Sequence, residues 1–519
     1  MKSPEDIVNL IKSLTGPEKR YFKVFVSKNS IGESNHYLKL FDLIDKTGSS
    51  ERKEIGKLYD NESFMNNQFR PYKHMLYEQI LKSLSAYHAE GSVHDKILEM
   101  IRRVEILYDK TLYDQAEKML EKAKAIAFKF ESFALLLEII RWQKKILSIS
   151  SSTPQKITEK VINQLVEEEK NIICKIDNSI EYWKLSILMS ISFWLKGEVR
   201  TQEDIHRLSA IIDSSILKNE ELALSYTAKR DLYSIYIIYY GAINNIQGAY
   251  EYCKKQMNLI NAHPHQIKEE INKYISSLHN LLYSTQCLKK YKEFFDLIPK
   301  LKSMSNNVQM GISESMRHKA KLFAYHLEFR AYVITGQFEK ATNLLPEIDD
   351  ALKEPKNKNE AIELFIIINK TMLYYGNGDH RNSLACINTI FNSKNINVLQ
   401  DHYSLARMFQ LLIHFEKGNT DLLPYLVKSV YRYLLQKKQL YKAETILFRF
   451  LRTQLNEIKT TKDQVGAFKT LKEELDGICN DPMEAVYLEN SYLIPLLESK
   501  IKNKPLEEIL REKSGFILD

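Results

Sequence analysis

Histidines, cysteines and acidic residues are the side chains of this sequence that are able to do chemistry, and their spacing decides which chemistry is open to them. The closest approach to a metal-binding pattern is His263-Pro264-His265, with Cys253 upstream. Because proline interrupts helices, we expect these two histidines in a connection between helices and not as the i, i+4 ligand pair of a helical metal site. The sequence therefore predicts surface histidines here and no metal or other cofactor.

Acidic residues cluster at residues 167–169 and at Asp349-Asp350, both within helical patterns. A general acid and a general base must converge on one pocket with separated pKa values, whereas solvated helix faces explain these clusters without a pocket. The chain also lacks a Gly-x-x-x-x-Gly-Lys-Ser/Thr phosphate loop, a Gly-x-Ser-x-Gly elbow and a His-Glu-x-x-His motif. We therefore predict that the protein is not an enzyme and has no catalytic, cofactor-binding or metal residues.

Basic residues near position 70 offer a nucleic-acid interpretation. A helix predicted to begin at Pro71 carries Arg70, Lys73 and His74 near its start, and a recognition helix places such side chains in the major groove of DNA. Phosphate contacts dominate the affinity of DNA-binding proteins, yet residues 1–95 hold 14 Lys and Arg against 13 Asp and Glu. This balance favours a small helical cap, with DNA binding through these three residues as the alternative.

The formal net charge of +8 is spread along the chain, with two mildly basic stretches. The first runs from Lys289 to Arg330 and the second from Lys428 to Lys459. The second stretch also contains Arg432, Lys437, Lys438, Lys442, Arg449 and Arg452. Such stretches attract phosphate backbones or acidic peptides, although they are more often the solvated faces of helices.

The five cysteines are scattered without a Cys-x-x-Cys pair, which argues against a disulfide framework and against a zinc cluster. The first residues lack the apolar run of a signal peptide. The most apolar stretch, Leu232 to Ile243, is shorter than the roughly 20 residues that a membrane span needs, so we expect a buried helix. We predict a cytoplasmic protein with mostly buried free thiols and no membrane partner.

Apolar residues recur with the 3.6-residue period of a helix, while the alternating patterns of strands are missing. Gly (16) and Pro (12) are scarce, which agrees with helices joined by short connections. At Thr15-Gly16-Pro17-Glu18 the sequence offers an N-cap and a proline in the first turn of a helix. We expect an all-α fold in which Trp142, Trp183, Trp194 and the tyrosine-rich run 233–240 pack between helices.

A motif of about ten residues recurs along the chain. Tyr291, Leu297, Ile298 and Pro299 are matched, 47 residues later, by Phe338, Leu344, Leu345 and Pro346. A third copy without the proline begins at Tyr113 and continues with Ala116, Met119, Leu120 and Ala123. Gly336, Gly378 and Gly418 punctuate the later region at spacings of 42 and 40 residues. Two-helix hairpins are too small to bury an apolar face alone, so such units must stack on their neighbours.

These residues resemble the tetratricopeptide repeat family, in which a glycine ends the first helix and an aromatic and a small residue open the second. Gly336, Phe338 and Ala341 fit that pattern, as do Tyr113 and Ala116. Thr111 stands where a turn glycine is expected, His380 replaces the aromatic after Gly378, and the spacing exceeds the family's. The resemblance implies a right-handed superhelical solenoid of antiparallel helical hairpins whose groove holds a peptide or a partner protein; other α-solenoids stay open.

We predict two parts: an N-terminal helical domain over residues 1–92 and a solenoid over residues 93–519 with a less regular C-terminal end. The predicted function is that of a scaffold or adaptor for a protein or peptide partner. The alternative is a transcriptional regulator with a DNA-binding N-terminal domain and a solenoid that acts as a sensor. An N-terminal unit that only caps the solenoid is compatible with the first function.

Overall fold

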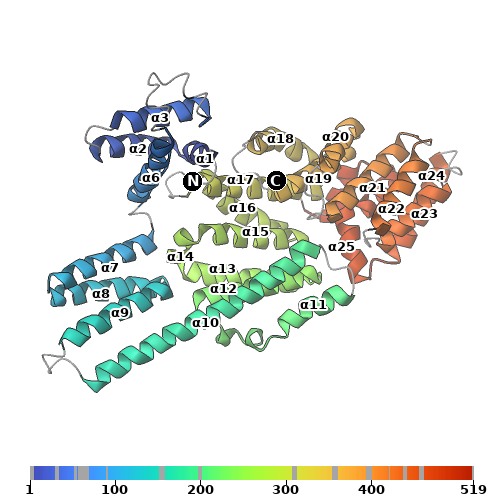
Figure 1. The fold of residues 1–519 in the computed structure, drawn as a ribbon. Coiled ribbons are helices and arrows are strands. Elements are labelled where there is room, and N and C mark those ends of the chain that lie inside the picture. The colour runs from blue at the N-terminus through green and yellow to red at the C-terminus, as the bar shows by residue number, and fades with distance from the viewer. Residues whose placement is uncertain are drawn as a thin grey trace. The chain divides into compact units, whose positions relative to one another are not determined.

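The computed structural model describes residues 5–29, 34–51, 55, 69–88, 92–150, 158–196, 202–306, 312–353, 360–392, 400–419, 421–436, 441–454 and 461–516. These residues form 25 α-helices and two short 3-10 helices, and they contain no strand (Figure 1). The predicted all-α class is therefore confirmed. The chain divides into two compact units, Met1–Ile172 and Ile173–Asp519.

The first four described helices build a core of their own. They are α1 (Glu5–Ser13), α2 (Gly16–Asn29), α3 (Ser34–Thr47) and α6 (Phe69–His88). The predicted N-cap of α2 is confirmed, because Glu18 accepts hydrogen bonds from both the backbone N–H and the hydroxyl of Thr15, at 2.7 and 2.8 Å. Buried side chains from all four helices, among them Ile11, Phe22, Phe41 and Ile80, close this core.

Helix α6 begins two residues earlier than predicted. The sequence placed its start at Pro71, whereas the helix starts at Phe69, so that Arg70 is already helical. Proline lacks a backbone N–H, but the N–H groups of the first helical turn have no partner within the helix, so Pro71 is tolerated there.

Three further helices and the start of a fourth complete the first unit. They are α7 (Val93–Asp109), α8 (Tyr113–Lys129), α9 (Phe133–Ser150) and α10 (Glu159–Lys196), the last of which continues into the second unit. Helices α7, α8 and α9 pack consecutively. The connection between α6 and α7 coincides with the predicted domain boundary at residue 92, which stays a prediction.

The second unit contains the remaining helices, and most of them pack against the next helix along the chain (Figure 1). In chain order they are α11 (Gln202–Ile212), α12 (Tyr226–Ala242), α13 (Ile246–Ala262), α14 (Pro264–Glu269), α15 (Ile271–Cys287), α16 (Tyr291–Asn306), α17 (Glu314–Ile334), α18 (Phe338–Leu352), α19 (Glu360–Gly376), α20 (His380–Phe391), α21 (Gln400–Glu416), α22 (Leu423–Gln436), α23 (Lys442–Gln454), α24 (Thr461–Asp476), α25 (Pro482–Ser491), α26 (Leu493–Lys502) and α27 (Leu506–Ser514). Alternate helices also meet, since α17 packs against α15 and α19, and α19 against α21. Each hairpin thus buries its apolar face against the next.

One turn geometry joins the two helices of six hairpins. The residue at its centre has a left-handed backbone; these residues are Thr111, Asn244, Lys289, Gly336, Gly378 and Gly418, with φ between 56° and 74°. The next residue donates its backbone N–H to a carbonyl five positions earlier, as from Gln337 to Tyr332 at 2.8 Å. This is the Schellman arrangement that ends helices. Three of its six centres are not glycine, which hides the repeat from a search for turn glycines.

The second helix of each hairpin buries the same positions relative to its turn. Five residues after the turn centre the side chain is small or apolar and buried: Ala116, Ala249, Phe294, Ala341, Ser383 and Leu423. Nine residues after it stand Leu120, Cys253, Ile298, Leu345, Ile387 and Val427, which are buried as well. The two positions are four residues apart, which is about one helical turn, so both lie on the same face of the helix. The predicted motif therefore marks a repeated structural register.

Two of the packing predictions for aromatic residues are confirmed and one is wrong. Tyr236 of α12 stacks on Tyr252 of α13 with ring centroids 4.5 Å apart, and Trp142 is buried. Trp183 is instead 59% exposed on α10, because it lies on the helix face opposite to the buried Tyr182 and Met189. The side chain of Trp194 lies outside the described residues.

The last helices fold back over hairpins that precede them by more than eighty residues. Lys500 forms an ion pair with Glu416 at 2.9 Å, Arg511 donates to the carbonyl of Gly336 at 3.1 Å, and Phe516 stacks on Phe295 at 5.5 Å. We call residues 493–516 the C-terminal strap. It contacts the ends of α21 and α17 and the start of α16 in turn, where the hairpin turns lie.

The described helices also bear on the membrane prediction. None of the described helices is both long enough and apolar enough to cross a bilayer. The stretch from Leu232 to Ile243, which the sequence marked as a buried helix, lies mainly in α12, where Leu232, Ile235 and Ile237 are buried.

Candidate functional site

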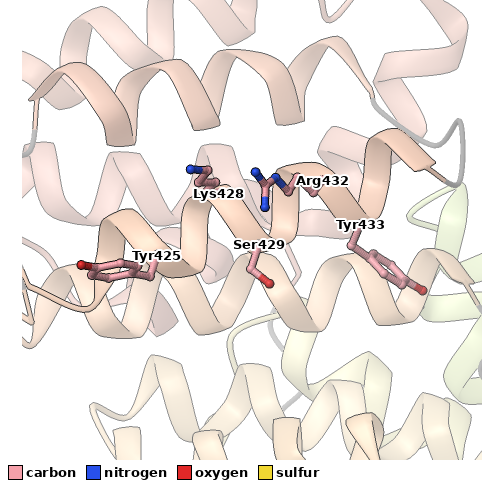
Figure 2. A pocket seen from close by; sticks show the side chains of 5 residues that line it. All are labelled: Tyr425, Lys428, Ser429, Arg432 and Tyr433. Carbon is pink, nitrogen blue, oxygen red and sulfur yellow. The ribbon is translucent and has the colours of Figure 1, made fainter.

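A hollow on the surface of α22 brings together basic and aromatic side chains. It has a volume of about 420 Å³ and is lined by Tyr425, Lys428, Ser429, Arg432 and Tyr433. The buried face of α22 fixes this arrangement. Leu423, Val427 and Val430 face the core and recur at helical spacing, so the residues that line the hollow lie on the outward side of the helix. Figure 2 shows Lys428 and Arg432 on the same side of the helix, between the rings of Tyr425 and Tyr433.

The two cations of this hollow have no counter-charge nearby. No carboxylate of the described residues lies within 4.0 Å of the Lys428 ammonium or the Arg432 guanidinium, and both side chains are exposed. Other members of the same basic stretch are neutralised: Lys442 pairs with Asp481 at 2.7 Å, and Arg449 pairs with Glu474. Lys428 and Arg432 are therefore two adjacent cations of the stretch that carry positive charge without an ion pair among the described residues.

A third cation, Arg407 of α21, lies behind Tyr433 in a cage of rings. Its guanidinium carbon is 4.9 Å from the centroid of Phe391, 4.9 Å from that of Tyr403 and 4.6 Å from that of Tyr433. Cation–π contacts of this kind contribute roughly 0.5–2 kcal/mol each, depending on how dry they are. They hold the Tyr433 ring in place at one end of the hollow.

Two polar atoms of this cage lack hydrogen-bond partners. Within the part of the chain that the structure describes, the buried Nε of Arg407 and the buried hydroxyl of Tyr433 make no hydrogen bond. Burial raises the pKa of Tyr433, helped by Tyr403 and opposed by Arg407, so this hydroxyl is protonated and able to donate. A buried donor without an acceptor costs free energy, so the ring contacts of the cage have to offset this cost.

The lining of the α22 hollow suits binding better than catalysis. It contains no carboxylate, histidine or cysteine, so Ser429 has no neighbouring base there to activate its hydroxyl. Positive charge beside exposed rings matches an anionic group attached to an apolar or planar body. The second hollow, of about 460 Å³ between α23 and α24, differs because its arginine is already paired with Glu474.

The residues of the DNA-binding alternative lie on the first turns of α6. Arg70 and His74 are exposed and Lys73 is half-buried, with its ammonium 5.8 Å from the centroid of the Phe69 ring. Burial and the neighbouring Arg70 lower the pKa of Lys73, while Asp6 opposes the change. The structure thus brings the three side chains together on one helix end, and DNA binding by them stays a prediction.

Only one histidine of the pair lies where it was predicted, between two helices, because His265 belongs to the first turn of α14; both are half-buried and not fully on the surface. His263 separates α13 from α14, which begins at Pro264, and its ring nitrogen is 2.9 Å from the carbonyl of Leu259. Cys253 is buried beside Ser284, and burial raises the pKa of its thiol to about 12. Over the described ranges, no three His, Cys, Asp or Glu side chains converge on a common point that suits a metal ion.

The prediction of mostly buried free thiols is confirmed for Cys253 and wrong for Cys174, and the other three thiols lie between these extremes. Cys174 is exposed on α10 and Cys253 is buried, while Cys287, Cys386 and Cys479 are half-buried. The sequence does not show which face of each helix points toward the core. The burial of the cysteines on these helices could therefore be read only from the packing in the structure.

The sequence indicated part of the α22 site and missed the rest. Lys428 and Arg432 belong to the second basic stretch, so their charge was noticed. Arg407 was missed, because its three rings come from α20, α21 and α22 and meet only in the folded unit. The available signal was a single charged residue within the otherwise uncharged and mostly apolar run 405–413.

Comparisons with known proteins leave the α22 site without a precedent. No family model, no curated protein and no solved structure matches this chain. The resemblance to tetratricopeptide repeats is therefore carried by the residues and turns described above. Functional inference has to start from the geometry of the second unit.

Proposed function

We propose that this protein is a binding scaffold of the tetratricopeptide-like type, and that the α22 hollow holds an acidic segment of a partner protein. The observation that carries the proposal is the pair Lys428 and Arg432. Both are exposed, have no counter-charge in the part of the chain that the structure describes, and lie beside Tyr425, which is 76% exposed. A bound carboxylate or phosphate would supply the counter-charge of both cations.

The repeated hairpins support the scaffold part of the proposal. Six hairpins share a left-handed turn and a common buried register, as stacked two-helix repeats do. Stacks of this kind offer extended surfaces, and their function lies in side chains that face away from the core. The α22 residues are such side chains.

The C-terminal strap supports the choice of α22 over other surfaces of the hairpins. Arg511 and Phe516 already contact the turn at Gly336 and the start of α16. The cation Arg330 of α17 is likewise engaged, by Gln286 at 2.7 Å and by the ring of Tyr283 at 4.9 Å. The cations of α22 have no such partners among the described residues.

The test is a charge reversal of the α22 pair in the full chain. Wild-type protein and the double variant Lys428→Glu, Arg432→Glu are used to capture partners from a native lysate, and each captured protein is identified by mass spectrometry. We expect the variant to lose a partner that the wild type retains, with an affinity at least about tenfold lower, because like charges then face each other.

A matched control separates this effect from the change in net charge. Lys417→Glu together with Lys469→Glu changes the net charge equally on exposed lysines that line neither hollow, and it should retain the partner. The binding segment of that partner, made as a peptide, should bind in a salt-dependent way. The proposal is wrong if the α22 variant and the control capture the same proteins with equal affinity.

A further inference from the structure

The long helix α10 carries a second apolar face that no described part of the chain covers. On one side it packs into the second unit through Tyr182 and Met189, both fully buried. On the opposite side Ile173, Ile180 and Trp183 are 52%, 53% and 59% exposed. A soluble helix normally shows one apolar stripe, so apolar residues on both faces indicate a missing neighbour.

The spacing of this exposed face identifies the neighbour as a helix. The residues Ile173, Ile176, Ile180, Trp183 and Ile187, which we call the α10 seam, are separated by intervals of three and four residues. This is the a and d pattern of a heptad repeat, in which side chains of one helix fit between those of a second helix with the same repeat. Ile187 is 40% exposed and Ile176 is half-buried, so the seam is open along its length.

The charges beside the seam indicate which helix this is. Asp177 and Lys184 each follow a d position and lie seven residues apart on the same edge, both exposed. In an antiparallel pair of α10 helices, Asp177 of one copy lies beside Lys184 of the other, and the two-fold axis creates this pair twice. The same register places Ile180 of one copy against Trp183 of the other, and Ile176 against Ile187.

A parallel pair lacks this complementarity. The opposite edge of the seam carries Ile172, Ser179 and Ser186 at the equivalent positions. Ile172 is buried, and Ser179 is engaged with Ser225 at 3.0 Å. That edge offers no charge to Asp177 or Lys184, so the antiparallel arrangement is the one that pairs both.

We propose that the α10 seam is the interface of an antiparallel homodimer, in which a second copy of this chain covers Ile173 to Ile187. Two identical seams then bury each other, and both Asp177–Lys184 pairs form between copies. Among the described residues the ion-pair partner of Lys184 is Glu181 on its own helix, at 3.2 Å, and the exposed Lys184 side chain is able to turn toward a second carboxylate. This interface does not depend on the α22 hollow.

The first experiment measures the mass of the full chain in solution by sedimentation equilibrium. We expect a monomer–dimer equilibrium for the wild type and at least about a hundredfold weaker dimerisation for Ile180→Glu, because a charge then enters the seam. The matched control is Ile106→Glu, which alters an equally exposed isoleucine (49%) on α7 and should dimerise like the wild type. Circular dichroism and the melting temperature confirm that both variants are folded.

The second experiment tests the direction of the helices by exchanging the charges. Asp177→Lys and Lys184→Asp should each weaken the dimer about tenfold, and the double variant should restore it to within about threefold of the wild type. A wild type that stays monomeric at high concentration overturns the proposal, as does an Ile180→Glu variant that dimerises normally. Single variants that weaken the dimer without rescue in the double variant overturn the antiparallel pairing.

Discussion

Gly336 shows how much a single backbone position determines in this protein. It has a φ of +66°, and a Cβ atom built on it would lie 2.2 Å from the carbonyl oxygen of Glu507 in α27. Only glycine allows both the left-handed turn after α17 and the close approach of the C-terminal strap. At Gly418 the same φ of +66° occurs with nothing within 4 Å of the added atom.

These two glycines permit a clean prediction at the scale of the residue. Gly336→Ala should lower the free energy of unfolding by more than about 2 kcal/mol, because it adds a backbone clash to the left-handed strain. Gly418→Ala carries the strain alone and should cost about 1 kcal/mol. Urea denaturation followed by circular dichroism measures both, and equal losses would show that the strap does not approach Gly336 as described.

Arg407 marks the limit of what sequence reveals about a single residue. Its neighbours in the chain are apolar, and a guanidinium there would be unfavourable without the rings of Phe391, Tyr403 and Tyr433 around it. Those rings are spread over 43 residues of sequence, from position 391 to position 433. A cage assembled from three helices leaves no local pattern, so the charge of the α22 site was foreseeable and its aromatic support was not.

At the scale of the element, the left-handed turn is a better marker of the repeat than glycine. Thr111, Asn244 and Lys289 occupy the position that Gly336, Gly378 and Gly418 occupy elsewhere. A side chain with a Cβ pays about 1 kcal/mol or more to adopt this backbone, which tertiary packing offsets. Three hairpins therefore looked irregular in sequence although their turns have the same geometry.

This equivalence predicts the effect of supplying the missing glycine. Lys289→Gly should raise the free energy of unfolding by about 0.5 kcal/mol, since relief of strain exceeds the added entropy of the unfolded chain. Lys292→Gly, three residues later on the exposed face of α16, should instead cost about 0.5–1 kcal/mol. Thermal and urea unfolding of the two variants compare them, and destabilisation by both would contradict a strained turn at Lys289.

Helix existence was predictable here, whereas helix exposure was not. Periodicity and capping residues located α2 and α12 because these signals are local to each element. For α10 the sequence predicted packing at Trp183, but that ring is 59% exposed. The intervals of three and four residues between the apolar side chains of α10 were visible in the sequence. A helix with two apolar faces, however, shows which face is buried only once its neighbouring helices are known.

At the scale of the whole molecule, the C-terminal strap joins parts of the second unit that are remote in sequence. The hydrogen bond from Arg511 to the carbonyl of Gly336 spans 175 residues. Leu506 and Leu510 belong to the same core cluster as the hairpins α15 to α21. The solenoid interpretation from sequence involved contacts only between successive hairpins, so it contained nothing that would place the strap.

The strap should therefore stabilise hairpins that precede it by more than a hundred residues. Leu506→Ala with Leu510→Ala removes two buried side chains and should lower the free energy of unfolding by about 3–6 kcal/mol. Hydrogen exchange should quicken at the Gly336 turn as well as in α27. Leu435→Ala, at a leucine that is 57% exposed, is the control, and unchanged exchange at Gly336 would show that the strap is dispensable there.

The strap also sets an order of events during synthesis. A ribosome that has released residues up to about 480 has delivered helices α11 to α24 of the second unit, but none of the strap residues that cover their turns. Until Leu506 to Phe516 emerge, the apolar surface around Phe295 and Phe338 faces water and the chaperones of the cell. Packing of the second unit is therefore complete only after the strap has been made.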